Sequence, residues 1–239
     1  MTHPHITTIS LFPNMFDALT SGIPGRALDN DLLTLSHLQL RDFAQPPHYR
    51  VDDRPYGGGP GMVMCYEPLA KAIDAAKANL PKASRVVHLS PQGKPVTHQK
   101  ILELSQLPGL ALVASRYEGI DARLLDTHID EEISVADCVV SGGELPAMIL
   151  IDALIRCLPG ALGDAQSAEQ DSFVSGLLDH PHYTRPESIN ELAVPPVLLG
   201  GNHAAIKAWR HEQSLKKTWQ MRPDLIKRDP SEKSETTDS

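Results

Sequence analysis

The sequence is poor in cysteine, and its cysteines form no recognisable ligand or disulfide pattern. Cys65, Cys138 and Cys157 are the only three in 239 residues, and they are widely spaced. An odd number at this spacing matches neither a zinc site nor a disulfide framework, so we expect three reduced, buried thiols. Reduced thiols are typical of the cytoplasm, and we therefore expect a cytoplasmic protein.

Long apolar runs and a signal-like N-terminus are also lacking. No apolar run approaches the roughly 18 residues that a membrane-spanning helix needs. The first ten residues have neither the basic start nor the apolar core of a signal peptide. These absences predict a protein without a membrane partner.

Positive charge is missing from the middle of the chain. Residues 131–155 contain no Lys or Arg but include the acids Glu131, Glu132, Asp137, Glu144 and Asp152. Within this span, Val139-Val140-Ser141-Gly142-Gly143-Glu144-Leu145-Pro146 leads into an apolar helix expected at about 146–158. A Gly pair lets the backbone approach a ligand closely, but a phosphate cradle usually needs a cation as well. The loop therefore predicts a neutral or cationic ligand and argues against a nucleotide polyphosphate.

A second glycine-rich run, Gly57-Gly58-Gly59-Pro60-Gly61, lacks the features of a nucleotide-binding loop. It has neither the Gly-Lys-Ser/Thr of a P-loop nor G-x-G-x-x-G spacing, and no strand directly precedes it. An NTPase or dinucleotide-binding function is therefore not favoured. We expect the run to shape the backbone near a ligand or a dimer partner, or to be a structural loop.

Strands and helices alternate through the first 160 residues. We expect strands at 6–12, 33–40, 85–89, 110–114 and 133–140, and helices near 69–80, 97–106, 121–128 and 146–158. This alternation predicts an α/β domain with a mostly parallel sheet. Ligands of such sheets bind at the carboxyl ends of strands. The loops at 90–94, 115–121 and 141–146 should follow such ends, so we expect them to converge on one pocket.

The last third of the chain has a different composition. Residues 161–172 are small and polar and suit a linker, 173–230 look helical with proline breaks, and 231–239 are charged and expected to be disordered. Basic residues gather between 200 and 228: Lys207, Arg210, Lys216, Lys217, Arg222, Lys227 and Arg228. They form either a phosphate-contacting surface or a solvated helix face.

Four further features are candidates for a site. The segment Arg116-Tyr117-Glu118-Gly119-Ile120-Asp121 is dense in polar groups and follows a strand, although a surface ion-pair cluster would look the same. Asp171 ends the linker, and Arg156 lies on the apolar helix. By pattern alone, the first could be a solvated acid and the second a rim residue. The run His180-Pro181-His182-Tyr183-Thr184-Arg185-Pro186 carries the stacking groups that single-stranded RNA recognition uses.

Taken together, these segments resemble one family, the bacterial tRNA (guanine-N1)-methyltransferases of the SPOUT superfamily. The resemblance rests on 52–62 (Asp-Asp-Arg-Pro-Tyr-Gly-Gly-Gly-Pro-Gly-Met), Ser90-Pro91-Gln92-Gly93-Lys94, 116–121, 141–147, and 176–178 with 181–186. The segments 197–199 and 201–203 extend it. The match covers essentially residues 6–210, in order and at family-like spacing.

The resemblance implies a fold and an activity. The fold would be a SPOUT-type parallel sheet with a deep trefoil knot, plus a small helical C-terminal domain. Residues 1–160 would form the knotted S-adenosylmethionine-binding domain, 161–172 a flexible linker, 173–230 the tRNA-binding domain and 231–239 a disordered tail. The enzyme would be a homodimer with its active site at the subunit interface. It would methylate N1 of the guanosine 3′ of the anticodon (position 37), with Mg2+ as a candidate cofactor whose ligands are unknown.

The resemblance also assigns roles to residues. Asp171 would be the general base and Arg156 the cation that orients guanine. The donor pocket would comprise Ser90, Pro91, Ser115, Tyr117, Glu118, Val135, Ala136, Asp137, Cys138, Val139, Val140, Gly142, Gly143, Leu145 and Pro146. The expected tRNA contacts are His182, Tyr183, Arg185, Lys207, Arg210, Lys216 and Lys217.

The chain departs from the family pattern at four positions. It has Ala114-Ser115 where the family usually has Cys-Gly, and Ala136-Asp137-Cys138 where the family usually has Gly-Asp-Tyr. Two flexible glycines are thereby replaced, which bears on donor affinity. Another SPOUT RNA methyltransferase would share the Gly-rich loop but lack the Asp171 and 181–186 segments. A non-catalytic RNA-binding protein would account for the basic stretch but leave the acidic loop unexplained.

Overall fold

The computed structural model describes residues 3–163 and 171–226. The chain divides into two compact units, Met1–Gly163 and Asp164–Ser239. Most of the expected linker, the expected disordered tail at 231–239, and the basic residues Lys227 and Arg228 lie outside the described residues.

The first unit is built on a five-stranded sheet in which all neighbouring strands are parallel. The strands are β1 (His5–Ser10), β2 (Thr34–Gln39), β5 (Arg85–Pro95), β6 (Gly109–Ala114) and β7 (Glu131–Ser134), in the spatial order β2-β1-β6-β5-β7. The expected α/β class with a parallel sheet is confirmed. Because all five strands run the same way, their carboxyl ends meet at one edge of the sheet.

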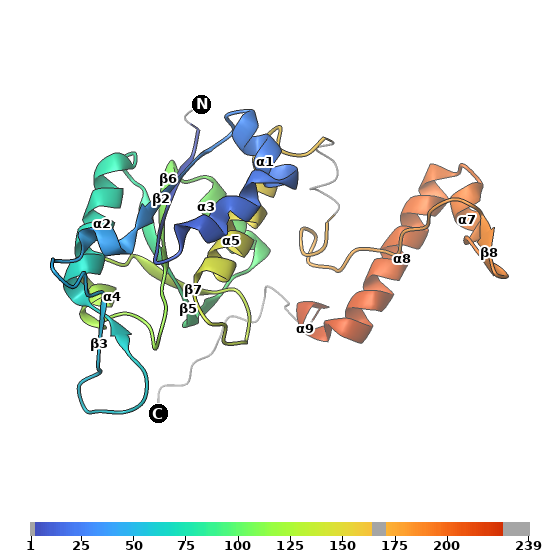
Figure 1. Cartoon of the computed structure of the whole chain (residues 1–239). Helices are drawn as coiled ribbons and strands as arrows, with labels where there is room; N and C mark the ends of the chain where they lie inside the picture. Colours follow the sequence, from blue (N-terminus) through green and yellow to red (C-terminus); the bar gives the residue numbers. More distant parts are fainter. Residues whose placement is uncertain (1–2, 164–170, 227–239) are drawn as a thin grey trace, which may run out of the picture. The chain divides into compact units, whose positions relative to one another are not determined.

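Helices cover both faces of this sheet (Figure 1). One face carries the 3-10 helix η1 (Pro13–Thr20) with α1 (Gly22–Asp29), α3 (His98–Ser105) and α5 (Glu144–Arg156). The other carries the 3-10 helix η2 (Leu40–Phe43) with α2 (Tyr66–Asn79) and α4 (Arg123–Thr127). Along β6, Leu110 and Leu112 enter the first core, while Ala111 and Val113 enter the second. Burial on both faces explains why the strands are continuously apolar.

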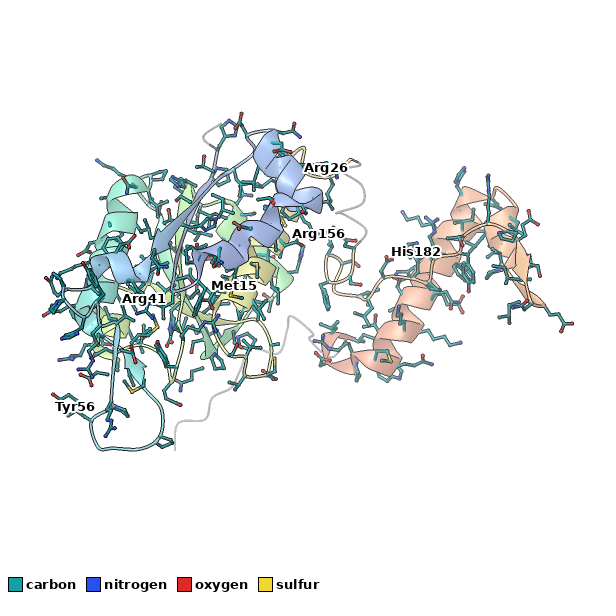
Figure 2. The ribbon with its side chains drawn as sticks, in the orientation of Figure 1. Met15, Arg26, Arg41, Tyr56, Arg156 and His182 are labelled. Atoms are coloured by element: carbon teal, nitrogen blue, oxygen red, sulfur yellow. The ribbon has the colours of Figure 1, made fainter. Side chains whose placement is uncertain are left out.

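A short hairpin carries the first glycine-rich run. Strands β3 (Asp52–Asp53) and β4 (Val63–Met64) pair antiparallel, and the run lies in the loop between them. Gly57, Gly58 and Gly59 have φ values of +85°, +79° and +112°, and a Cβ on any of them would meet nothing within 4 Å. Tyr56, labelled in Figure 2, is fully exposed beside them. The glycines are needed here for backbone conformation and make no close approach to other described residues.

Two elements around the second Gly pair differ from expectation. Helix α5 begins at Glu144, with Gly143 as its N-cap, and ends at Arg156, so Pro146 is its third residue. A proline costs little there because the first N–H groups of a helix have no partner within it. The strand expected at 133–140 ends at Ser134. Val139 and Val140 are exposed and line a cavity, so their β-branched pattern reflects a surface instead of a sheet.

The turn expected at 90–94 is a bulge within β5. The pairing of β5 with β7 shifts between Leu89 and Lys94, both of which lie opposite Ile133. A Cβ at Gly93 would lie about 2.5 Å from the backbone of Glu132. The close approach of the two strands therefore requires glycine at this position.

The second unit is helical with one short hairpin. Its described elements are β8 (Ser188–Ile189), β9 (Leu192–Ala193), α7 (Pro196–Leu199), α8 (His203–Met221) and α9 (Pro223–Ile226). The side chain of Asn202 caps α8 by accepting a hydrogen bond from the backbone N–H of Ala205 at 3.1 Å. Within α8, Thr218 is fully buried, and its hydroxyl accepts a hydrogen bond from the N–H of Leu178. This contact holds the segment after Asp171 against the helix.

The three cysteines are free, but none of them is fully buried, contrary to expectation. Cys138 is exposed, and Cys65 and Cys157 are half-buried. The loop that carries Cys138 leaves the sheet after β7, which the strand pattern did not predict. None of the helices within the described residues is long and apolar enough to cross a membrane.

Candidate active site

The three loops at the strand ends converge on one cavity of about 480 Å³, as expected. Residues 90–92 follow the core of β5, Ser115 follows β6, and residues 142–146 open α5. Of the residues that the resemblance assigns to the donor, all but Asp137 line this cavity: Ser90, Pro91, Ser115, Tyr117, Glu118, Val135, Ala136, Cys138, Val139, Val140, Gly142, Gly143, Leu145 and Pro146.

The charged side chains among the described residues that line this cavity are all acidic. Glu118 and Glu132 line the cavity, whereas no Lys or Arg is among its described lining residues. Apolar groups such as Leu89, Ile120 and Ile149 make up much of the remainder. An anion would find no cation here, while a cationic ligand would find two carboxylates and an apolar surface.

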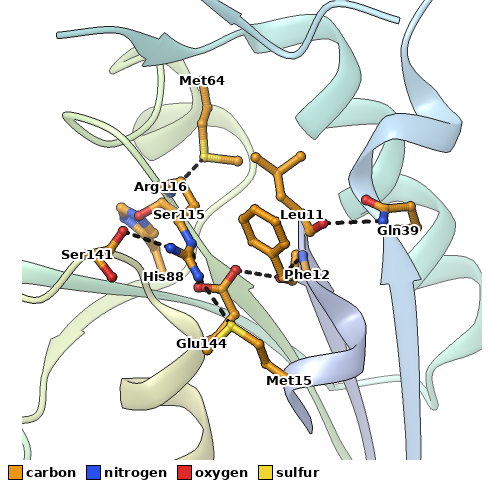
Figure 3. A network of polar contacts seen from close by, with 11 residues as sticks. Leu11, Phe12, Met15, Gln39, Met64, His88, Ser115, Arg116, Ser141 and Glu144 are labelled. Carbon is orange, nitrogen blue, oxygen red and sulfur yellow. Dashed lines mark hydrogen bonds and ion pairs between the residues drawn. The ribbon is translucent and has the colours of Figure 1, made fainter.

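An arginine from outside the cation-free segment 131–155 lies behind the loop (Figure 3). Nε of Arg116 lies 2.8 Å from Oε2 of Glu144, and Nη1 donates a hydrogen bond to the carbonyl of Ser141 at 3.2 Å. Its guanidinium also lies over the ring of Phe12, 4.6 Å from the centroid. These contacts hold Arg116 against the loop, and no Lys or Arg is among the described residues that line the cavity.

Glu144 is the buried end of this network. Its side chain has no exposed area, and its Oε1 accepts a hydrogen bond from Ser10 at 2.6 Å. Oε2 and Nε of Arg116 face each other as an ion pair, but neither atom has a hydrogen-bond partner of good geometry. The pair joins β1, the loop after β6 and the first turn of α5.

The Gly pair is required by close packing. A Cβ at Gly142 would collide with the side chain of Arg116, and one at Gly143 would lie 2.7 Å from Cα of Ala114. The N–H of Gly143 also donates to the carbonyl of Ser115 at 2.8 Å. Glycine thus lets the loop reach the end of β6, and it leaves the backbone open toward the cavity.

The loop after β6 is tied to the β3–β4 hairpin. The N–H of Glu118 donates to the carbonyl of Met62, and the carbonyl of Gly119 accepts from the N–H of Met64. Tyr117 has a φ of +61°, which is uncommon for a residue with a side chain and typical of functional loops. The alternative interpretation of residues 116–121 as a surface ion-pair cluster also holds in part. The guanidinium of Arg123 pairs with Asp121 and lowers the pKa of that carboxyl.

The backbone accommodates Ser115 and Ala136, the two residues that stand where the family usually has glycine. Neither Ser115 nor Ala136 is among the described residues with a left-handed backbone. A Cβ therefore introduces no backbone strain at either position. Ser115 also gains a partner, because its hydroxyl lies 2.9 Å from Nε2 of His88.

Arg156 is the last residue of α5 (Figure 2) and does not line the donor cavity. Leu145, Ile149 and Arg156 share one face of the helix, since spacings of four and seven residues return to the same side. Arg156 lies about 10 Å along the helix axis from Ile149 at 1.5 Å per residue. The face that begins at the cavity therefore ends at this cation.

Asp171 and several expected tRNA contacts line two cavities of the second unit. One, of about 510 Å³, is lined by Asp171 together with Asp179, His180, Lys207 and Arg210, among others. The other, of about 450 Å³, is lined by His182, Tyr183, Arg185 and Arg210, among others. His180, Ile206 and Arg210 belong to both. Lys216 and Lys217 are exposed on α8 and line neither cavity.

One cluster of three possible metal ligands occurs within the described residues, formed by Asp179, His180 and His182. Nε2 of His182 lies 2.8 Å from the carboxylate of Asp179. Burial alone would raise the pKa of Asp179, but hydrogen bonds from His182 and from the N–H of His180 outweigh burial and lower it. Two imidazoles suit borderline metals, whereas Mg2+ prefers oxygen ligands, so this cluster does not fit Mg2+.

The sequence missed two polar residues of the cavity, His88 and Glu132. Both line it, and Nδ1 of His88 lies 2.9 Å from Oε1 of Glu132. The local signal for His88 was a lone histidine in the otherwise apolar core of β5, and Glu132 was one of the acids of the span 131–155. Its partner lies 44 residues away, and no local pattern connects the two.

A family model and several known proteins that are similar to this chain all point to the same family. Residues 5–228 match the family model described as tRNA (Guanine-1)-methyltransferase TrmD. A tRNA (guanine-N(1)-)-methyltransferase of Coxiella burnetii (strain RSA 493 / Nine Mile phase I) is 60% identical over 223 residues, which cover 93% of this chain and 91% of the relative. Enzymes of the same name from Aromatoleum aromaticum and Alcanivorax borkumensis are 59% and 56% identical. They cover 91% and 92% of this chain, and 85% and 84% of their own lengths. The chain therefore belongs to the tRNA (guanine-N1)-methyltransferase family.

Proposed function

We propose that this protein transfers a methyl group from S-adenosylmethionine to N1 of the guanosine 3′ of the anticodon in tRNA, and that it does so in the cytoplasm. The observation that carries the choice of donor is the lining of the cavity. Its described residues offer two carboxylates, apolar surface and no Lys or Arg. A sulfonium is a cation without phosphates, so it suits this lining better than a nucleotide polyphosphate would.

The chemistry divides between a base and a cation. When bound, the donor supplies an electrophilic methyl group. N1 of guanine carries a proton at neutral pH, and we assign its removal to the carboxylate of Asp171. Negative charge then develops on O6, and the guanidinium of Arg156 would stabilise it through a planar pair of donors. We leave the ligands of Mg2+ unassigned, because the cluster at Asp179 does not fit that ion.

We also propose a homodimer whose active site forms between subunits. Leu145 and Ile149 support this, because they are large apolar residues of α5 that are about half-exposed in the single chain. Arg156 lies on the same face of the helix, beyond the cavity. A partner that covers this face would bury the apolar residues and could bring its own Asp171 to the donor.

The proposal also includes the knotted fold of the family and separate ligands for the two units. We assign the SPOUT trefoil knot to the segment from β5 to α5, since the close passage of residues 142–143 beneath the end of β6 is compatible with a threaded chain. We assign donor binding to the first unit and tRNA binding to the second. The cations of α8 and the stacking groups at 182–185 support the latter assignment.

Titration of the full-length protein tests the donor assignment. S-adenosylmethionine and S-adenosylhomocysteine should both bind without tRNA, because one unit contains the whole cavity. ATP and NAD should show no submillimolar binding, because their phosphates would face carboxylates. Absence of heat and of thermal stabilisation with both sulfur ligands, or submillimolar affinity for ATP, would contradict the proposal.

A further inference from the structure

A chain of three polar side chains crosses the ends of three neighbouring strands at the cavity. His88 of β5 is buried, with a side chain that is 4% exposed. Its Nδ1 lies 2.9 Å from Oε1 of Glu132 on β7, and its Nε2 lies 2.9 Å from Oγ of Ser115, directly after β6. His88 and Ser115 appear together in Figure 3, and all three residues line the cavity.

The carboxylate at one end fixes the hydrogen atoms along this chain. An ionised Glu132 only accepts hydrogen bonds, so Nδ1 of His88 must carry the proton that it shares with Glu132. Burial lowers the pKa of His88, although the hydrogen bond and the charge of Glu132 oppose the shift, and the imidazole is therefore neutral at neutral pH. Nε2 of a neutral ring with a protonated Nδ1 can only accept. Ser115 must then donate its hydroxyl hydrogen to His88.

This direction decides what Ser115 can offer to a ligand. Its single hydrogen is committed to His88, so toward the cavity the hydroxyl oxygen can act only as an acceptor. Networks of this kind also restrict rotation of the hydroxyl, which lowers the entropy cost of binding. An acceptor held at the end of β6 suits an amino or hydroxyl group of a ligand.

We propose that Ser115, oriented by His88 and Glu132, accepts a hydrogen bond from an N–H or O–H group of the bound methyl donor. The inference rests on the proposed binding of S-adenosylmethionine in this cavity. Ser115 touches the donor, while His88 acts through Ser115 and is a positioning residue. The serine and the histidine form a pair, because a glycine at position 115 would leave Nε2 of His88 buried without this partner.

Donor titration of the full-length protein tests this inference. Ser115→Ala removes the acceptor, and we expect a roughly 3- to 10-fold loss of affinity, which corresponds to one hydrogen bond. S-adenosylmethionine and S-adenosylhomocysteine should lose affinity equally, because they share their amino and hydroxyl groups. His88→Phe should cause a smaller loss, because the hydroxyl remains but is no longer oriented. In the Ser115→Ala background, His88→Phe should cause little further loss, because His88 acts only through Ser115. The control is Ser105→Ala at the end of α3, which should bind like wild type.

The outcomes separate this inference from the proposal on which it rests. If the wild type binds neither ligand, the donor assignment and this inference both fall. If the wild type binds the donor, and Ser115→Ala and Ser115→Gly both bind it as tightly as the wild type, only the inference is overturned. A loss confined to S-adenosylmethionine would place the contact at the sulfonium and contradict a hydrogen bond to the shared groups. Melting temperatures identify variants that fail to fold, and Ser115→Gly replaces Ser115→Ala in that event.

Discussion

At the scale of the residue, Asp171 and Arg156 are proposed for different tasks, and their substitution should have different signatures. Asp171→Asn keeps size and polarity but cannot accept the N1 proton. Single-turnover methylation at saturating donor and tRNA should fall by at least about 100-fold, the lower range for loss of a general base. Arg156→Lys should also lower the methylation rate, because the planar guanidinium with its paired N–H donors is lost although the charge remains. Donor affinity should be unchanged in both variants.

The matched control for the base is Asp224→Asn, which removes a carboxylate of the same unit that pairs with Arg222 at the surface. It should methylate tRNA at the wild-type rate. A rate for Asp171→Asn within about threefold of wild type, far from the loss expected for a base, would falsify its assignment. Asp171 would then be an ordinary linker acid.

At the scale of the element, the first turn of α5 depends on the buried pair of Arg116 and Glu144. Glu144→Gln leaves the guanidinium without its carboxylate, and breaking a buried pair costs about 3–5 kcal/mol. The double variant Arg116→Met/Glu144→Leu should be more stable than either single change, because no buried charge remains. Chemical denaturation measures these differences in the free energy of unfolding.

A surface pair provides the comparison for this prediction. Arg123→Met breaks the ion pair with Asp121, in which the arginine side chain is 73% exposed. It should cost less than about 1 kcal/mol, as is usual for exposed ion pairs. If Glu144→Gln were no more destabilising than Arg123→Met, the pair at α5 would not hold the loop.

The cations of α8 should contribute to tRNA affinity by neutralising phosphates. Replacing exposed Lys216 and Lys217 with Gln should weaken tRNA binding and make the slope of affinity against salt concentration shallower by about 1 for each phosphate that is no longer neutralised. Lys71→Gln/Lys82→Gln removes the same charge from the first unit and should change tRNA binding little. Equal effects of the two double variants would indicate a general charge effect instead of a defined surface.

The elements around the site show what a single sequence can and cannot predict. The apolar helix α5, the alternation of strands and helices and the convergence of three loops all followed from local patterns. The strand expected at 133–140 exists but ends at Ser134. Its expected extension was wrong, because β-branched residues also line a cavity when the backbone leaves the sheet. The pairs Arg116–Glu144 and His88–Glu132 join residues that are far apart in sequence, and only the fold brings them together.

At the scale of the whole molecule, the proposed active site needs two chains. We predict that Asp171→Ala and Gly142→Leu are each inactive, the second because any side chain there collides with Arg116. When equal amounts of the two variants are mixed and refolded together, half of the dimers should be heterodimers. Each heterodimer should have one working site, so about a quarter of the wild-type activity should return. No recovery, with heterodimers verified by mass, would show that each site lies within one chain.

Mass mapping of the product tests the proposed methylation of N1 of one guanosine in tRNA. Transfer RNA with a guanosine 3′ of the anticodon is incubated with the protein and S-adenosylmethionine, and the digested fragments are analysed by mass spectrometry. We predict a single 1-methylguanosine at that position, and no methylation when the guanosine is replaced by adenosine. Methylation of another nucleotide or another atom, or no methylation by a protein that binds both donor and tRNA, would contradict this account.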